Sequence, residues 1–457
     1  MKNSELVARY DGRVPRYTSY PTAPYFSATV NSETYSAWLG TLSPDAPLSL
    51  YIHVPFCDRL CLYCGCNTSV VHHEQPRRDY AHLLGLEINM LADRLGHLAG
   101  HRAAVSHVHW GGGTPTCLPN DCLTGIMDLI RRRFVVRADA EIAIEIDPTS
   151  FTPDKADALI LMGVNRASLG VQDFDEKVQA AIGRMQSYEE TKACADMLRA
   201  GGIHAINLDL IYGLPHQTVA SVVRTAQQAL TLQAGRIAVF GYAHVPWMKR
   251  HQALIKDAWL PDAPARFAQM QAIAGVLEGE GCYVPVGLDH YAQPDDAMAV
   301  ALRDKSLHRS FQGYTTDVAP TLLAVGASSI GSLPQGYVQN ATSVPAYATA
   351  ITVGKFATVR GVALTADDIL RRVVIEKIMC DLEVDLAAVA RSMDADPVAL
   401  LAAADNLLPM CHDGLVIWDG LRLSVTERGR PFVRNVAALF DAYLTIEDAM
   451  PKYAKAV

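Results

Sequence analysis

Four cysteines lie within one short segment, at positions Cys57, Cys61, Cys64 and Cys66. At this spacing their thiolates can converge on a single metal centre, since sulfur is a preferred ligand of zinc and of iron–sulfur clusters. A structural zinc site draws on a second pair of Cys or His ligands a dozen or more residues away, and no such pair follows downstream. Three thiolates on a four-iron cluster leave one iron open for a further ligand. We therefore expect Cys57, Cys61 and Cys64 to hold a cluster; Cys66 follows Cys64 too closely to extend the same chelate comfortably.

Further polar groups follow the next predicted strands. The run GGGTPT (111–116) comes directly after the second strand, and Glu145 ends the third. Three glycines let the backbone approach a ligand such as an amino acid, although a tight turn explains them equally well. Glu145 and Asp209 end apolar strands, where a buried carboxylate needs a partner such as ribose hydroxyls, an ammonium group or a salt bridge.

An alternation of short apolar runs and amphipathic stretches must position these groups. The predicted strands are 48–54, 104–110, 140–146, 166–171, 204–211 and 236–242, and the predicted helices are 79–98, 121–134, 153–162, 189–200 and 221–232. Strand followed by helix, repeated about six times, predicts a parallel sheet with helices outside it. Six units are fewer than the eight of a closed barrel, so an open partial (β/α)6 barrel and a doubly wound sheet both remain possible. In either fold the ligand site lies at the carboxyl ends of the strands.

The remaining segments predict a four-part organisation. Residues 1–45, rich in Pro, Tyr and Thr, show no helical or strand period and are expected to be extended. Residues 46–290 form the barrel, and 291–364 form a barrel extension that covers the substrate. Residues 365–457 predict a small, mostly helical, winged-helix-like domain. Because acidic residues run throughout it and no basic stripe is present, packing or a lid is a better interpretation than DNA recognition.

Composition narrows the class of protein. The 457 residues are 50% hydrophobic and 19% charged, which predicts a compact globular protein. A net charge of -8 argues against a nucleic-acid partner. No apolar stretch reaches the roughly 18 residues of a membrane span, and the start lacks the apolar core of a signal peptide, so we expect a cytoplasmic protein. Its thiols then stay reduced, and the six cysteines outside the four-cysteine segment are expected to be small buried hydrophobes.

The run YIHVPFCDRLCLYCGCN (51–67) resembles the Cys-x3-Cys-x2-Cys signature of the radical S-adenosylmethionine superfamily. Several further runs are similar to the oxygen-independent coproporphyrinogen III oxidases, and together they cover most of the chain. They are RYTSYPTA (16–23), HWGGGTPT (109–116), EIDP (145–148), GVQDF (170–174), NLDLIYGLP (207–215), DHYAQPDD (289–296) and FQGYTT (311–316).

The resemblance implies a [4Fe–4S] cluster on Cys57, Cys61 and Cys64, with S-adenosylmethionine on the open iron. It also implies a radical enzyme that converts two propionates of coproporphyrinogen III to vinyl groups through a 5′-deoxyadenosyl radical, giving protoporphyrinogen IX. An electron-donor protein, an electron acceptor and a monomeric state are expected.

The resemblance assigns residues to two copies of S-adenosylmethionine. Contacts to the first copy are expected from Tyr51, Gly112, Glu145 and Ile330. Contacts to a second copy are expected from Tyr63, Gly113, Thr114, Gln172, Arg184, Asp209 and Ala243. Candidate cations for the substrate carboxylates are Arg16, Arg303, His308 and Arg309.

Three alternatives share some of these features. A haem chaperone of the same superfamily would bind haem without synthesis, and a haem-degrading radical methyltransferase would also take a tetrapyrrole and S-adenosylmethionine. The RYTSYPTA run and Cys66 count against the chaperone, and RYTSYPTA with FQGYTT favours the oxidase over the methyltransferase. A zinc scaffold without enzymatic activity is the most distant alternative.

Overall fold

The computed structural model describes residues 2–43, 45–99, 103–444, 453 and 455. The chain forms two compact units, each assembled from separate stretches of sequence. The sheet unit comprises residues 26–209 and 317–363, and the terminal unit comprises residues 1–25, 210–316 and 364–457. The cysteine segment and most of the expected site residues belong to the sheet unit.

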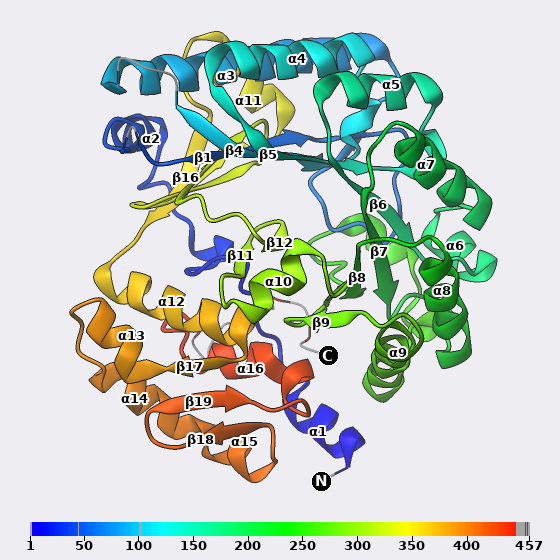
Figure 1. Ribbon diagram of the computed structural model, residues 1–457, viewed down its shortest axis with the longest axis vertical. Coiled ribbons are helices and arrows are strands. Elements are labelled where there is room, and N and C mark those ends of the chain that lie inside the picture. Colours follow the sequence, from blue (N-terminus) through cyan, green and yellow to red (C-terminus); the bar gives the residue numbers. More distant parts are fainter. Residues whose placement is uncertain (1, 44, 100–102, 445–452, 454, 456–457) are drawn as a thin grey trace. The chain divides into compact units, whose positions relative to one another are not determined.

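Parallel strands form the centre of the sheet unit (Figure 1). Strand β1 (Leu48–Val54) pairs with β4 (Ala104–Gly112), β4 pairs with β5 (Val135–Ile146), and β5 pairs with β6 (Arg166–Gln172). Because this order follows the sequence without a reversal, the sheet winds in one direction, as in a barrel, and not outward from a switch point as in a doubly wound sheet. The open-barrel prediction is therefore confirmed.

The other side of β1 carries an extension of the sheet. Strand β13 (Thr321–Val325) pairs with β1 in parallel, and β14 (Ile330–Leu333), β15 (Gly336–Asn340) and β16 (Thr358–Ala363) continue it in antiparallel order. The remaining strands of the unit are β2 (Phe56–Cys57), β3 (Ser69–Val70) and the start of β7 (Ala205–Tyr212). Strand β1 thus has a neighbour on both edges, and six of its seven residues are buried. Continuous burial is typical of a parallel strand covered on both faces.

Helices cover one side of the parallel strands, and Figure 1 shows α3, α4 and α5 lying along it. The helices of this unit are α2 (Ser32–Leu39), α3 (Glu74–Ala99), α4 (Asn120–Arg133), α5 (Pro153–Met162), α6 (Glu176–Ile182), α7 (Tyr188–Ala200) and α11 (Val344–Thr352). Local signals set their ends. Helix α5 starts at Pro153 and stops at Gly163, whose φ is 73°. Helix α7 starts with a capping box between Ser187 and Glu190.

The terminal unit contains the rest of the chain. Its helices are α1 (Asn3–Tyr10), α8 (Val219–Thr231), α9 (Ala263–Gly275), α10 (Ala297–Arg303), α12 (Ala366–Asp381), α13 (Leu386–Ser392), α14 (Val398–Ala404), α15 (Leu408–His412) and α16 (Val433–Ala438). Its strands are β8 (Arg236–Gly241), β9 (Val284–Val286), β10 (His290–Ala292), β11 (His308–Ser310), β12 (Gly313–Thr315), β17 (Glu383–Asp385), β18 (Val416–Trp418) and β19 (Arg422–Val425). The C-terminal segment is the small, mostly helical domain that the sequence predicts, and it contains the β18–β19 hairpin.

The prediction that residues 1–45 form an extended segment was wrong for two stretches, which are helical. Helix α1 buries Leu6 and Val7 in the core of the terminal unit. Helix α2 is capped by Asn31, whose side chain accepts hydrogen bonds from the backbone N–H groups of Glu33 and Thr34. Each helix has only about two turns, so the period of apolar residues is too short to stand out among polar neighbours.

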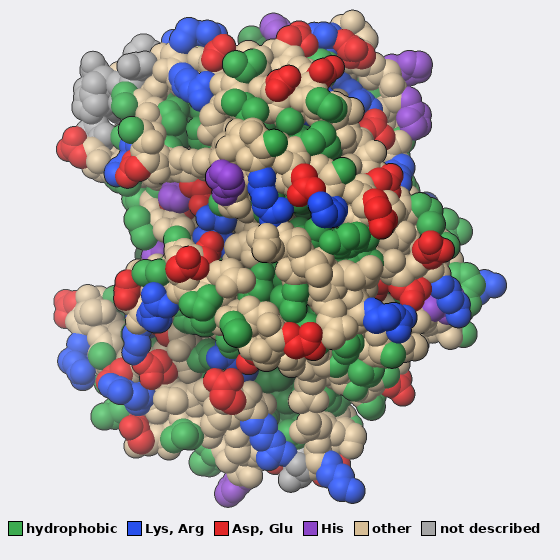
Figure 2. All heavy atoms as spheres, turned by 45° about the vertical axis from the view of Figure 1, so that its right-hand side comes forward, with side chains coloured by type: hydrophobic (Ala, Val, Ile, Leu, Met, Phe, Trp, Pro, Cys, Tyr) green, Lys and Arg blue, Asp and Glu red, His purple; other side chains and the backbone are tan. Residues whose placement is uncertain are grey.

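On the face that Figure 2 shows, basic and acidic side chains are interspersed and form no basic stripe. Within the described residues, no helix is both long and apolar enough to cross a membrane.

A buried carboxylate ties α3 to the sheet extension. Glu87 is fully buried and accepts hydrogen bonds from Gly326 N at 2.8 Å, Asn340 Nδ2 at 2.7 Å and the Tyr347 hydroxyl at 2.6 Å. Burial opposes the charge more than these three donors favour it, and it raises the pKa of Glu87 to about 7. The turn that contains Gly326 is thereby held against α3.

We expect stability to fall as pH rises through this titration. Because the pKa of Glu87 rises from an ordinary 4.5 to about 7 on folding, the unfolded chain loses this proton first. The stabilisation from Glu87 is full below about pH 4.5 and is lost as pH approaches 7, by about 3 kcal/mol from the pKa difference. Urea unfolding across this pH range measures it. The Glu87→Gln variant carries no titrating group at this position, so its free energy of unfolding should depend less on pH over this range. An equal pH dependence in the variant and the wild type would contradict the assignment.

Candidate functional site

The cysteine segment is a loop that follows β1 directly. Cys57 ends β2, which pairs in parallel with β3 just beyond the last cysteine. Cys64 N donates to Cys61 O at 3.1 Å, and Leu62 N donates to Ile182 O at 2.9 Å at the end of α6. These backbone bonds fix the loop between the strand ends and α6.

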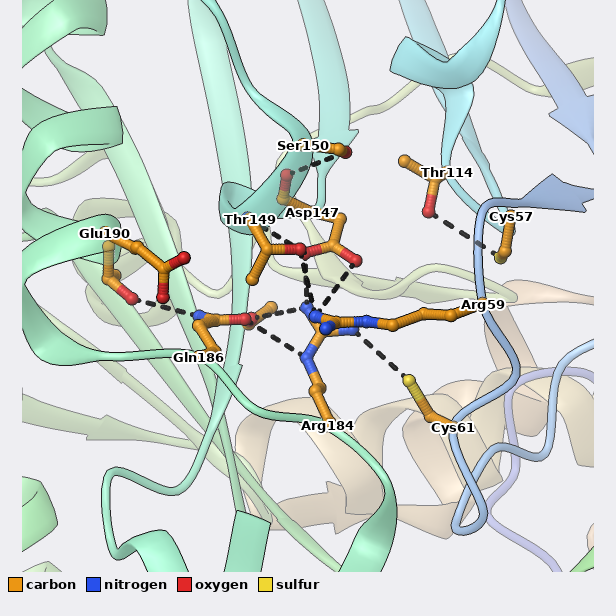
Figure 3. Close-up of polar contacts among 12 residues, drawn as sticks. Cys57, Arg59, Cys61, Thr114, Asp147, Thr149, Ser150, Arg184, Gln186 and Glu190 are labelled. Carbon is orange, nitrogen blue, oxygen red and sulfur yellow. Dashed lines mark hydrogen bonds and ion pairs between the residues drawn. The ribbon is translucent and has the colours of Figure 1, made fainter. Parts of the chain in front are cut away.

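Each of the three predicted ligand sulfurs accepts a hydrogen bond, and each donor is of a different kind. The donors are the Thr114 hydroxyl to Cys57 Sγ at 3.6 Å, the Arg184 guanidinium to Cys61 Sγ at 3.5 Å, and the backbone N–H of Cys66 to Cys64 Sγ at 3.4 Å. The first two are drawn in Figure 3. Donors aimed at sulfur favour the thiolate, which is the form that binds a metal.

The chemistry of these sulfurs fits a metal cluster. Burial raises the pKa of Cys57 to about 11 in spite of the Thr114 hydroxyl, so its thiolate needs a further positive partner. A bound cation supplies that partner by displacing the proton. Within the described residues, no three His, Cys, Asp or Glu side chains converge closely enough to hold a single metal ion. A four-iron cluster holds its cysteines further apart, because each sulfur binds a different iron.

The glycine ridge at 111–113 lies close to the start of the cysteine loop and to the end of β1. A Cβ atom at Gly113 would lie 2.5 Å from Phe56 O and 2.9 Å from Cys57 Sγ. A Cβ at Gly112, whose φ is 118°, would lie 2.7 Å from the His53 ring. Close approach therefore requires these glycines.

Glu145 lies beside the ridge with part of its side chain exposed. It accepts a hydrogen bond from Gly112 N at 3.1 Å, and His109 Nε2 lies 3.4 Å from its carboxylate. Burial opposes its ionisation, but His109 and the Gly112 N–H outweigh that effect and lower the pKa of Glu145. Its side chain is 39% exposed, so an ionised carboxylate oxygen remains available to a ligand cation or hydroxyl.

An aromatic wall completes this part of the site. The Tyr51 ring stacks on His109 at 5.8 Å, and its hydroxyl lies 3.0 Å from His53 Nδ1. Burial lowers the pKa of His53, which favours the neutral ring. The Ser328 hydroxyl lies 3.3 Å from His53 Nε2, two residues before Ile330.

The structure brings together three of the four residues expected at the first S-adenosylmethionine. Tyr51, Gly112 and Glu145 share the contacts above, and Ile330 begins β14 just after the turn that reaches His53. Sequence reasoning missed His53 and His109. The sequence did carry a signal for them. His53 lies two residues after Tyr51 in β1, and His109 lies two residues before Gly111 in β4, so each shares a strand face with a residue of the site.

Six of the seven residues expected at the second S-adenosylmethionine belong to the sheet unit, and one belongs to the terminal unit. Thr114 and Arg184 contact the cysteine sulfurs directly, and Gly113 lies against Cys57. Gln172 ends β6 with a φ of 69°. Tyr63 lies in the cysteine loop and Asp209 in β7, both in the sheet unit, whereas Ala243 belongs to the terminal unit.

Ala243 lines a basic pocket of the terminal unit. Arginine side chains and tyrosine rings dominate its lining, including those of Arg16, Arg266, Arg434, Tyr212 and Tyr242. Sequence reasoning missed Arg266 and Arg434, which stand in α9 and α16 without any motif. Asp289 also lines the pocket. Burial opposes its charge, but His290, Arg309 and Arg16 outweigh burial and lower the pKa of Asp289 to about 2.

Of the four cations expected at the substrate, Arg16 lines this pocket and Arg309 contacts the backbone of Arg16. Arg309 donates to the Arg16 carbonyl from two nitrogens, at 3.2 and 3.1 Å, and Arg16 lines the pocket itself. Arg303 instead donates to Pro294 O on an exposed stretch, and His308 lies 3.0 Å from a Glu376 carboxylate oxygen.

Comparisons with known proteins bear on this site. The model of the Radical SAM superfamily matches residues 51–229, and the model of the HemN C-terminal domain matches residues 364–432. An oxygen-independent coproporphyrinogen III oxidase of Bradyrhizobium diazoefficiens is 50% identical over 442 residues, 96% of this chain and 97% of that protein. The protein of the same name from Escherichia coli is 39% identical over 453 residues, 99% of this chain and 98% of that protein.

A solved structure agrees with the sequence comparisons. The structure of coproporphyrinogen III oxidase from Escherichia coli, described as a radical SAM enzyme, matches with a TM-score of 0.88 and 38% identity. The match covers 95% of this chain and 100% of that chain.

Replacing Gly113 by Ala should damage the cysteine loop. The added Cβ would overlap Phe56 O, a backbone atom that cannot turn away, and would press on Cys57 Sγ. We expect the iron bound per chain after anaerobic reconstitution to fall at least severalfold. The control is Gly125→Ala, because Gly125 is exposed in α4 with nothing within 4 Å of an added Cβ. That change should leave iron binding intact and stabilise the helix by about 0.5–1 kcal/mol. Equal iron content in both variants would contradict the close-approach argument.

Proposed function

This chain belongs to the oxygen-independent coproporphyrinogen III oxidases, which are radical S-adenosylmethionine enzymes, and on that premise we propose that Cys57, Cys61 and Cys64 hold its [4Fe–4S] cluster. The enzyme catalyses the oxidative decarboxylation of coproporphyrinogen III without oxygen. One observation carries the ligand assignment: a hydrogen-bond donor faces each of the three sulfurs. Relatives at 39–50% identity over nearly the whole chain favour this function over the haem chaperone and the methyltransferase.

We propose that Glu145 binds the first S-adenosylmethionine together with Tyr51, Gly112 and Ile330. The carboxylate is ionised and partly exposed, so it can accept a hydrogen bond from an ammonium group or a hydroxyl of the ligand. Tyr51 and its histidine neighbours form one wall, which orients the ligand and excludes water from it. When bound, the cluster and S-adenosylmethionine supply the hydrogen abstraction from the substrate; the side chains supply position.

A second S-adenosylmethionine per chain remains a proposal that rests on the family resemblance. Its contacts would come from Tyr63, Gly113, Thr114, Gln172, Arg184, Asp209 and Ala243. We also propose that the basic pocket of the terminal unit takes propionate carboxylates of the substrate. Its guanidinium groups outnumber its one carboxylate, Asp289, and its tyrosine rings offer apolar faces.

The redox partners, oligomeric state and location of the enzyme are proposed from the same premise. A donor protein supplies the electron, a separate acceptor removes the last one, and the enzyme acts as a monomer in the cytoplasm. The composition and the resemblance support these assignments.

Replacing Cys61 by Ser should abolish both the cluster and turnover. We expect the variant to lose the visible absorption of the cluster because one of three sulfur ligands is gone. Anaerobic incubation with coproporphyrinogen III, a reductant and S-adenosylmethionine should then yield neither vinyl product nor 5′-deoxyadenosine. Cys282→Ser is the matched control, since Cys282 lies in the terminal unit and is exposed, contrary to the expectation that it is buried. If wild-type protein with about four irons per chain forms neither product, the catalytic assignment fails.

Replacing Glu145 by Gln should weaken the binding of S-adenosylmethionine while the cluster stays in place. The amide keeps the shape of the side chain but loses the charge, and a hydrogen bond to a charged group contributes enough for about a tenfold increase in the dissociation constant. Equilibrium binding to anaerobically reconstituted protein measures the change. Glu189→Gln, an exposed site in the first turn of α7, should bind as the wild type does. An unchanged dissociation constant in the Glu145 variant would remove this residue from the ligand site.

A further inference from the structure

Arg184 is held in one orientation by acceptors from separate segments (Figure 3). Its Nη2 donates to Gly170 O at 2.9 Å and to Asp147 Oδ1 at 3.2 Å, and its Nε donates to Gln186 Oε1 at 3.2 Å. Gly170 belongs to β6, and Asp147 follows the end of β5. With these three bonds in place, the remaining nitrogen, Nη1, points at Cys61 Sγ at 3.5 Å.

A second layer of buried bonds keeps Gln186 in place. The backbone N–H of Gln186 donates to Gln179 Oε1 at 3.0 Å, and its side-chain Nε2 donates to Thr191 Oγ1 at 2.9 Å. Gln179, Gln186 and Thr191 are each at most 3% exposed. A fully bonded, buried polar network of this kind is rigid, so the guanidinium has little freedom to turn away from the sulfur.

The hydrogen bonds of Arg184 leave little capacity for another ligand. A guanidinium carries five N–H groups, and four of them are directed at Gln186, Asp147, Gly170 and Cys61. The contact proposed above from Arg184 to a second S-adenosylmethionine would therefore use the fifth N–H group or displace one of these partners.

We propose that Arg184 is a positioning residue for the cluster: its hydrogen bond to Cys61 makes the cluster easier to reduce. The proposal rests on the assignment of Cys61 as a cluster ligand. A hydrogen bond to a ligand sulfur withdraws negative charge from it, and hydrogen bonding to sulfur is one of the factors that set cluster potentials. One electron enters from the external donor, no bond forms or breaks in the protein, and Arg184 keeps its proton. The added negative charge is stabilised by the nearby N–H donor.

Arg59 provides a matched control in the same network. It donates to Thr149 Oγ1 at 2.9 Å and lies 3.7 Å from Asp147 Oδ2, so it shares the carboxylate that orients Arg184 (Figure 3). It also donates to Met185 O at 3.1 Å, and among the described residues no cysteine sulfur accepts a hydrogen bond from it. Its side chain is 34% exposed against 9% for Arg184, so water screens its charge more strongly.

The test is an anaerobic redox titration of the reconstituted full-length enzyme, followed by electron paramagnetic resonance without S-adenosylmethionine. In Arg184→Met we expect the equilibrium constant for one-electron reduction to fall about tenfold, a shift of ~59 mV to lower potential. In Arg59→Met it should change less than twofold. Equal shifts in the two variants, or no shift in Arg184→Met, would overturn the proposal. Weaker S-adenosylmethionine binding at an unchanged potential would assign Arg184 to the ligand alone.

A second measurement needs no change at Arg184. Wild-type enzyme with ¹⁵N in its arginine guanidinium groups should show a ¹⁵N coupling to the reduced cluster in pulsed electron paramagnetic resonance. The coupling should persist in Arg59→Met. Its absence from wild-type protein with an intact cluster would overturn the proposal even if Arg184→Met fails to fold. A wild-type protein that assembles no four-iron cluster would instead refute the proposed function.

Discussion

The close approach of two backbone segments determines the site. In the parallel register of β1 and β4, His53 lies opposite Gly111 and Val54 opposite Gly112, so both strands end at the same edge. The glycine ridge then meets the cysteine loop with no room for a side chain at Gly113. Cys57 follows β1 and Thr114 follows β4, so both are placed by where these two strands stop. Glu145, near the end of the neighbouring strand β5, reaches the same contact through its hydrogen bond from Gly112 N.

The three sulfurs lie in different electrostatic surroundings. A neutral hydroxyl faces Cys57, a backbone N–H faces Cys64, and a guanidinium faces Cys61. A fixed charge acts over a longer range than a neutral dipole, so the corner of the site near Cys61 differs most from the others. The asymmetry comes from β5 and β6, whose carboxyl ends supply Asp147 and Gly170 to orient that charge.

Much of the sheet could be predicted because strands covered on both faces leave a continuous apolar signal. The predicted strand 48–54 coincides with β1, and the functional groups at the strand ends followed from it. The helices α1 and α2 were missed because two turns carry too little periodicity. Buried polar networks gave no local signal at all: Glu87 meets Gly326 across 239 positions of sequence, and Arg184 meets Asp147 across 37. Such partners become visible only when the chain has folded.

The position of β13 beside β1 has a consequence for synthesis of the chain. Strand β1 gains its second neighbour only when residues 321–325 have been translated, long after β4. Until then one row of its backbone N–H and C=O groups is unpaired, and an unpaired edge is open to mispairing with other chains. A nascent polypeptide that stalls before this point therefore exposes the strand that leads into the cysteine loop. Assembly of the metal centre on the ribosome would precede the fold that shelters it, so the order of translation favours maturation after release.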